Sequence, residues 1–258
     1  SIRARLSAKA KWMPEEMIGV QRDVYSSVHH LVAQQVVAAW DRKKNDRVEI
    51  AEAVEQLRKW NGQMDANAAA PMIAAKIYEQ LRKLIAENAA GALNDPLRGQ
   101  VSPTAIERIL REHPQGWFPD WDAVLVRSLI GAFEDGARTQ GSKVSRWQFG
   151  QSQPLRIANP VLGQLPWIGR YFAIGPEPMG GSSWSVQQYN GRLGPSLRMT
   201  VDLSAIEHSF IGLTAGESGQ PLSSHYKDQW ESYMGGKLIP MQFEKVEWKG
   251  VLNFLPAR

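Results

Sequence analysis

The residue pattern of this chain changes abruptly near Gly136, and the change limits the folds that the chain can adopt. Before this point, apolar residues recur at intervals of three and four, which is typical of amphipathic helices. After it, glycine, proline, serine and tryptophan become dense, and short β-type runs lie between turn signals. The pattern therefore predicts an α+β protein, with a helical region over residues 1–140 and a strand-rich region over residues 141–258.

Several helices are expected in the first region. One begins at Pro14, with acids in its first turn, and its apolar face is expected to continue as far as Val36. Ser102 has the residue type and position of a helix cap, directly before Pro103. The remaining helices are expected at residues 50–60, 71–84, 103–110 and 121–133.

The second region is expected to contain short strands and one short helix. The helix is predicted over residues 226–234 and would end at two glycines. The predicted strands are residues 184–187, 196–203, 209–213, 238–243 and 251–254.

One predicted strand carries charges on a single face. By period two, Arg198, Thr200 and Asp202 share one side of residues 196–203, opposite an apolar side. If both sides are covered, Arg198 and Asp202 must be paired, because burying a lone charge is costly. A structural ion pair is the first interpretation, and a role for Asp202 beside an active site is the second.

Composition excludes several classes of function. The chain has 258 residues, 43% hydrophobic and 22% charged, which is ordinary for a folded protein. The net charge of +4 is spread along the chain without interleaved aromatic residues, so no nucleic-acid partner is expected. No apolar run approaches the roughly 20 residues of a membrane-spanning helix. There is no cysteine, and the adjacent His29 and His30 cannot share an ion on a helix, so no metal site is expected.

The segment over residues 215–230 (AGESGQPLSSHYKDQW) gathers residue types found in serine hydrolases. Ser218, His225 and an acid such as Asp228 would form a triad only if they converged in space. Ser218 lacks the strand-to-helix elbow on which such a nucleophile sits. The alternative is structural: glycines permit a tight loop, Ser223 or Ser224 caps the following helix, and polar side chains satisfy backbone groups. The structural interpretation is favoured.

An ordered set of motifs runs through the chain. Its members are residues 14–17 (PEEM), 21–26 (QRDVYS), 194–203 (GPSLRMTVDL), 216–230 (GESGQPLSSHYKDQW) and 239–243 (IPMQF). In order and spacing the set resembles the C-terminal part of the β-chain of the penicillin acylases, which are N-terminal nucleophile amidohydrolases. The resemblance covers nearly the whole chain. It implies that the strand-rich half forms part of an αββα Ntn-hydrolase sandwich.

The resemblance also implies where the chemistry lies. It assigns Gly219, His225, Tyr226, Asp228 and Gln229 to a structural motif, so the triad interpretation is rejected. The family's N-terminal serine is followed by asparagine, whereas Ser1 is followed by isoleucine and arginine, so Ser1 is not taken as the nucleophile. We therefore expect no catalytic residue and no cofactor in this segment. Asp202 and Arg198 are candidates for supporting the active site without touching the substrate: Asp202 would orient an upstream histidine or pair with Arg198.

The parent protein implied by the resemblance is an amide hydrolase acting through an acyl-enzyme. Its expected partners are the upstream α-chain, the N-terminal part of the β-chain and a small N-acyl substrate. That substrate would be a β-lactam side chain or an acyl-homoserine lactone, and the expected location is periplasmic or secreted. The chain begins without methionine, so we expect a processed product or a piece of a longer polypeptide.

One departure from the family supports a rival hypothesis. Residues 180–187 (GGSSWSVQ) lack the acid and the asparagine of the family's usual turn, so substrate contacts made by that turn cannot be carried over. The rival is a non-catalytic scaffold or binding module derived from the acylase fold. A third hypothesis, a hydrolase using Ser218, requires His225 within hydrogen-bond distance of that hydroxyl.

Overall fold

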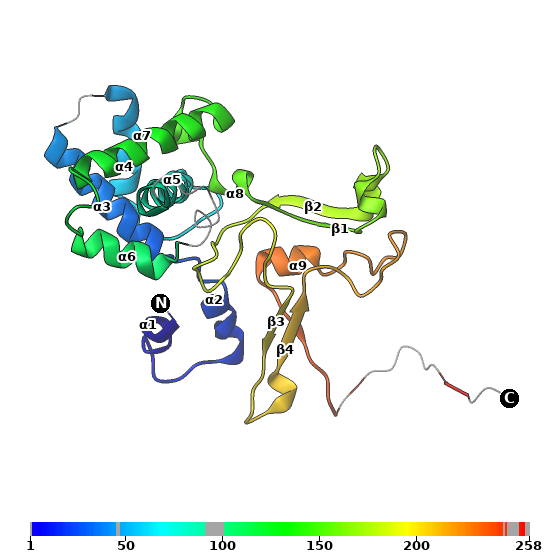
Figure 1. Cartoon of the computed structure of the whole chain (residues 1–258). Coiled ribbons are helices and arrows are strands. Elements are labelled where there is room, and N and C mark those ends of the chain that lie inside the picture. Colours follow the sequence, from blue (N-terminus) through cyan, green and yellow to red (C-terminus); the bar gives the residue numbers. More distant parts are fainter. Residues whose placement is uncertain (1, 45–46, 91–100, 245, 247–252, 256–258) are drawn as a thin grey trace. The chain divides into compact units, whose positions relative to one another are not determined.

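A computed structural model describes residues 2–44, 47–90, 101–244, 246 and 253–255 (Figure 1). The chain divides into two compact units. Unit 1 contains residues 23–159 and 175–194, and unit 2 contains residues 2–22, 160–174 and 195–258. Helices do dominate before residue 141 and strands follow it, but the units are interleaved along the chain. The division into regions 1–140 and 141–258 stays a prediction.

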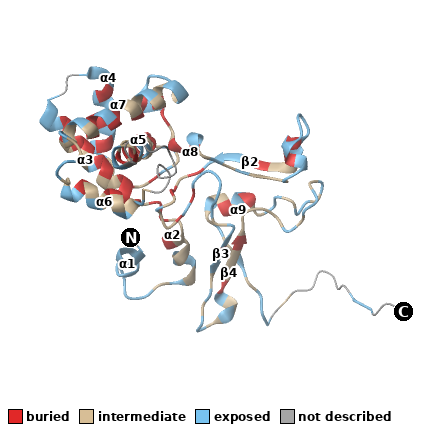
Figure 2. Cartoon of the chain, viewed as in Figure 1, coloured by how far each residue is buried: buried red, intermediate tan, exposed pale blue. Residues whose placement is uncertain are grey.

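Unit 1 is built around a helical core. Its helices are α3 (Ser27–Lys43), α4 (Val48–Arg58), α5 (Ala70–Ala90), α6 (Pro103–Glu112), α7 (Trp121–Gln140) and α8 (Phe149–Ser152). Helix α5 packs against both α7 and α3, and their facing sides carry the buried residues (Figure 2). The fully buried side chains include Val32, Val36, Ile73, Ile77, Leu81, Leu125 and Leu129. The burial of these apolar faces holds the helices together.

Helix starts in unit 1 follow the expected capping chemistry. The Oγ of Ser102 accepts a hydrogen bond from the backbone N of Ala105 at 3.2 Å, so the predicted cap is confirmed. Asp120 caps α7 in the same way, accepting from Ala123 N at 3.0 Å. The helices predicted at residues 50–60, 71–84, 103–110 and 121–133 are all present, and α7 is longer than predicted.

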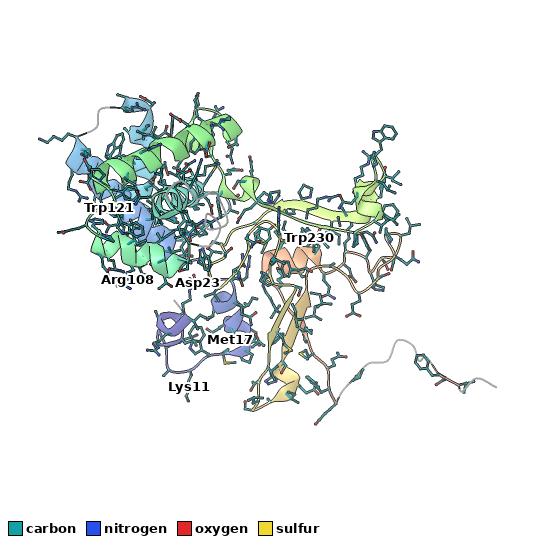
Figure 3. The ribbon with its side chains drawn as sticks, in the orientation of Figure 1. Lys11, Met17, Asp23, Arg108, Trp121 and Trp230 are labelled. Carbon is teal, nitrogen blue, oxygen red and sulfur yellow. The ribbon has the colours of Figure 1, made fainter. Side chains whose placement is uncertain are left out.

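The continuous helical face predicted from Pro14 to Val36 is wrong. The chain instead forms a 3-10 turn (Pro14–Glu16), α2 (Met17–Gln21) and then α3, with a break between the two helices. In the break, Asp23 is buried and its carboxylate accepts from Tyr25 N at 3.1 Å (Figure 3). A side chain that binds its own neighbouring backbone competes with helical hydrogen bonds. Backbone bonds from Ser26 N to Gly62 O and from Met64 N to Val24 O then fix the break.

The strand predicted over residues 184–187 is also wrong. This segment forms turns, with an isolated bridge between Ser182 and Gln188. Its backbone is tied to distant loop residues instead: Gly181 N donates to Met64 O, and Gln187 N donates to Asp23 O at 2.8 Å. Two strands that were not predicted, β1 (Pro154–Ala158) and β2 (Ala173–Pro178), form a two-stranded sheet.

Unit 2 contains a small antiparallel sheet in the order β3-β4-β5. The elements are α1 (Ile2–Leu6), α2, the 3-10 turns Leu162–Gln164, Gly169–Phe172 and Ile206–His208, β3 (Leu197–Thr200), β4 (Phe210–Leu213), α9 (Trp230–Gly235) and β5 (Ile239–Pro240). In the register, Leu197 pairs with Leu213 and Met199 with Ile211. Ile211 in turn pairs with Ile239.

Several predicted bounds in unit 2 are corrected. The strand predicted over 196–203 ends at Thr200, because the carboxylate of Asp202 closes a turn by accepting from Ser204 and Ala205. The helix predicted over 226–234 starts only at Trp230, and the strand predicted over 238–243 shortens to β5. The strand predicted over 251–254 lies partly outside the described residues, and its described part forms no strand.

The sheet of unit 2 has an unusual polarity. Arg198 is only 4% exposed, whereas its neighbours Leu197 and Met199 on the opposite face are 46% and 45% exposed. The Arg198 side chain reaches α9, where its guanidinium lies 4.0 Å from the ring centroid of Tyr233. The sheet therefore turns its charged face inward, toward α9, and its apolar face outward.

No helix in the described part of the chain is long and apolar enough to cross a membrane.

Candidate functional site

The segment over residues 215–230, which contains the residue types of a catalytic triad, does bring a histidine and a carboxylate together. The Nδ1 of His225 donates to Oδ2 of Asp228 at 2.8 Å. The pair lines an open pocket of about 560 Å³ in unit 2, together with Glu217, Ser218 and Ser223. The His225 side chain is 72% exposed, so water screens this pair strongly.

The serine does not join this pair. The Oγ of Ser218 accepts from the backbone N of Gln220 at 3.1 Å, which closes a local turn. The Oγ of Ser223 accepts from the backbone N of His225, also at 3.1 Å. Among the described residues no hydrogen bond links a serine hydroxyl to the His225 imidazole. The geometry that nucleophilic catalysis requires is therefore not assembled here.

The same residues hold the loop together. Gln229 Oε1 accepts from Leu213 N at 3.0 Å, which satisfies the end of β4, and Tyr226 O accepts from Gly216 N. A Cβ at Gly216 would lie 1.8 Å from His225 O, so only glycine fits at this position. Gly219 has open space around it and no such restriction. Neither Ser223 nor Ser224 caps a helix, because α9 starts at Trp230.

Arg198 and Asp202 lie in different surroundings. Arg198 is buried, which lowers its pKa, and its Nη1 donates to Tyr233 O at 3.0 Å. Asp202 lies beyond β3 and accepts from the Oγ of Ser204 at 2.7 Å and from its backbone N at 2.9 Å. These bonds from Ser204 lower the pKa of the Asp202 carboxyl. The roles of Asp202 and Arg198 beside an upstream active site stay predictions.

The structure contains a second pocket that sequence reasoning missed. It lies in unit 1, has a volume of about 220 Å³, and is lined by residues that include His29, Tyr78, Ser182 and Trp184. His29 and Tyr78 come from α3 and α5, with ring centroids 5.0 Å apart. In the sequence, this pocket is indicated only by His29 and Tyr78, two polar ring residues on otherwise apolar helix faces. Satisfied core residues show the same pattern.

The ionisable groups of this second pocket are shifted by burial. His29 is 4% exposed, and burial lowers its pKa to about 4. Its Nδ1 shares a hydrogen bond of 2.7 Å with the Oγ of Ser26. Burial also raises the pKa of Tyr78, an effect that the nearby Arg82 opposes. The described residues include no group of three histidines or carboxylates placed to hold a metal ion.

Comparisons with known proteins identify the family. The penicillin amidase family model matches residues 1–250, and the chain belongs to that family. Acyl-homoserine lactone acylase QuiP of Pseudomonas syringae pv. syringae is 27% identical over 243 residues, covering 83% of this chain and 29% of that protein. The QuiP protein of Pseudomonas aeruginosa is 26% identical over 247 residues, covering 80% of this chain and 29% of that protein.

A solved structure supports the fold. The thermostable penicillin G acylase from Alcaligenes faecalis matches with a TM-score of 0.61 at 13% identity, covering 100% of this chain and 52% of that chain. The family resemblance and the α+β fold class predicted from the sequence are thus confirmed, and the fold is similar to that of a penicillin acylase. The chain spans less than a third of the length of the curated relatives that it matches.

Proposed function

We propose that this chain is the C-terminal part of an acylase-type amide hydrolase that cleaves an N-acyl bond through an acyl-enzyme. The observation that carries the proposal is the family match over residues 1–250 in a chain whose Ser218, His225 and Asp228 do not form a triad. The nucleophilic serine then lies in the part of the parent protein upstream of this segment. The homologous acylases support an N-acyl substrate, such as an acyl-homoserine lactone.

The exposed sheet face of unit 2 is the surface through which this chain would join its parent. Residues paired across antiparallel strands point to the same side of a sheet, so one face gathers apolar side chains from all three strands. They are Leu197, Met199, Ile211, Leu213 and Ile239. An exposed apolar sheet face is the surface that sheet-on-sheet packing buries. Its proposed occupant is a sheet formed by the upstream α-chain and the N-terminal part of the β-chain.

An activity assay on separated and combined polypeptides tests the proposal. The chain alone should not release homoserine lactone from an N-acyl homoserine lactone, whereas co-expression with the upstream polypeptide should restore turnover. Replacing Ser1 or Ser218 by alanine should leave the combined activity unchanged. Turnover by the chain alone that disappears in Ser1→Ala or Ser218→Ala would overturn it.

The upstream gene sequence separates the enzyme from the scaffold. A serine followed by asparagine and an aromatic residue at a processing site supports the acylase. Absence of such a site favours a binding module, the alternative suggested by the altered turn at Ser182 and Ser183. A periplasmic or secreted location belongs to the same proposal, and cell fractionation of the tagged parent protein tests it.

A further inference from the structure

The pocket of unit 1 contains a buried polar group that the fold leaves unsatisfied. Tyr78 is 3% exposed, and within the described residues its hydroxyl makes no hydrogen bond of ordinary geometry, although Arg82 lies near enough to oppose the rise of its pKa. Burying a hydroxyl without a partner costs free energy, and most buried polar atoms in native proteins are satisfied. Helix α5 holds Tyr78 by its core packing against α3 and α7, so the fold keeps this hydroxyl in place despite the cost.

The pocket is too large to be explained by one bridging water. Its volume is about 220 Å³, and one water occupies roughly 30 Å³ of liquid. The pocket therefore has space for a small ring compound. The volume and the buried hydroxyl are independent observations, and together they make this pocket a candidate ligand site.

The walls of the pocket define the chemistry of that ligand. Met64 and Phe149 are buried apolar residues, and Trp184 and Tyr189 add aromatic surface. Flat apolar walls of this kind pack well against another ring. The occupant is therefore expected to be cyclic, and the polar side chains of Gln153, Ser182 and Asn190 in the same lining favour a compound that also carries a polar group.

The charges around the pocket favour an uncharged ligand. His29 is neutral near pH 7, because burial disfavours its cation. Glu79 and Arg82 both line the pocket, and Arg82 Nη2 lies 3.5 Å from the Glu79 carboxylate, so their charges offset each other. With Nδ1 of His29 bonded to Ser26, the Nε2 atom remains for a ligand, and the His29 and Tyr78 rings lie 5.0 Å apart, centroid to centroid. An imidazole nitrogen and a hydroxyl can each bond an oxygen atom of the ligand.

We propose that this pocket, lined by His29, Tyr78 and Trp184, binds a small uncharged ring compound that carries a hydroxyl or carbonyl oxygen. The oxygen bonds Tyr78 and His29, and the ring packs against the apolar walls. The site lies wholly in unit 1 and shares no residue with the 215–230 segment. It does not rest on the proposed amide hydrolysis, because binding is measured on this chain alone.

Phenol is a suitable probe, and calorimetric titration of the full chain measures its affinity. Phenol should bind at millimolar concentrations or tighter, whereas toluene, which lacks the oxygen, and benzoate, which is charged, should bind more weakly. Tyr78→Phe should weaken phenol binding about 2–10-fold, the loss expected for one hydrogen bond. Tyr171→Phe, which removes an exposed hydroxyl, is the matched control and should leave phenol binding unchanged.

Thermal unfolding provides a second readout that a purely structural role would not produce. Without phenol, Tyr78→Phe should raise the Tm by about 2–4 °C, because the variant no longer buries an unsatisfied hydroxyl. Ala75→Leu, which fills the pocket from α5, should abolish phenol binding. The proposal is overturned if phenol does not bind, if benzoate binds more tightly than phenol, or if Tyr78→Phe binds phenol as the wild type does. It is also overturned if Tyr78→Phe lowers the Tm.

Discussion

Acidification should destabilise this chain through His29. The imidazole is buried, with its Nδ1 bonded to Ser26, and burial lowers its pKa to about 4 from the ordinary value of 6.5. Between these two pH values the unfolded chain binds a proton that the folded chain excludes. The contribution of His29 to stability is therefore complete above pH 6.5, and it is lost as the pH falls from 6.5 toward 4. Below pH 4 no further loss arises from this residue.

The size of the effect follows from the pKa difference. A difference of one unit corresponds to about 1.4 kcal/mol, so the loss is about 1.4 kcal/mol at pH 5.5 and on the order of 3 kcal/mol at pH 4. Urea unfolding at several pH values between 7.5 and 4.5 measures it. His29→Gln, which cannot ionise in this range, should lack this part of the pH dependence.

Comparing variants separates His29 from the carboxylates. Hydrogen bonds from Arg58 and Arg42 lower the pKa values of Asp41 and Asp122, so these acids also weaken the fold on acidification. Their contribution is common to wild type and His29→Gln and cancels in the difference. The reasoning is refuted if both proteins lose the same stability between pH 7.5 and 4.5. An NMR titration of His29 in the wild type gives its pKa directly, and a value near 6.5 would refute it equally.

Three substitutions test other parts of the structure. Met199→Lys, on the exposed sheet face, should leave the Tm of the chain unchanged but prevent its co-purification with the upstream polypeptide; retained co-purification would place the interface elsewhere. Ser102→Ala should lower the free energy of unfolding by about 1 kcal/mol in urea, and no change would mean that the cap is dispensable. Gly136→Ala would place a Cβ 2.4 Å from Cη2 of the buried Trp147 and should cost about 1–3 kcal/mol. Gly19→Ala, which meets nothing within 4 Å, is the control, and equal Tm values would contradict the packing at Gly136.

The helices were predictable because their signals are local. Ser102 and Pro103 mark the start of α6 within a few residues, and the structure confirms the cap. The errors occur where distant residues decide the backbone. Residues 184–187 have β-type composition, but Gly181 and Gln187 bond to Met64 and Asp23, which are remote in sequence. No local pattern reports such bonds, so the sequence predicts a strand where the structure has turns.

The pocket of unit 1 was missed for a related reason. His29 and Tyr78 are 49 positions apart on different helices, and each alone is typical of a satisfied core residue. Only the packing of α3 against α5 brings them together, and only the full hydrogen-bond network shows that the Tyr78 hydroxyl is unsatisfied. By contrast, His225 and Asp228 are three positions apart, so their contact could be predicted from the sequence. Whether that contact is catalytic or structural could not be predicted from the spacing alone.

The β3 strand shows one feature of the fold that the sequence pattern alone does not determine, namely which of its two faces is buried. Successive side chains of a strand point to opposite faces of the sheet, so the sequence correctly predicts Arg198 on one face and Leu197 and Met199 on the other. This pattern alone does not say which face is buried. A free-standing sheet would bury the leucine and the methionine, and this one buries the arginine against Tyr233. Fully burying such an apolar side chain stabilises a protein by about 1.5–3 kcal/mol, so each half-exposed residue leaves on the order of 1 kcal/mol unrealised. In the proposed parent acylase, the upstream polypeptide would cover this outward face and make it an interior one.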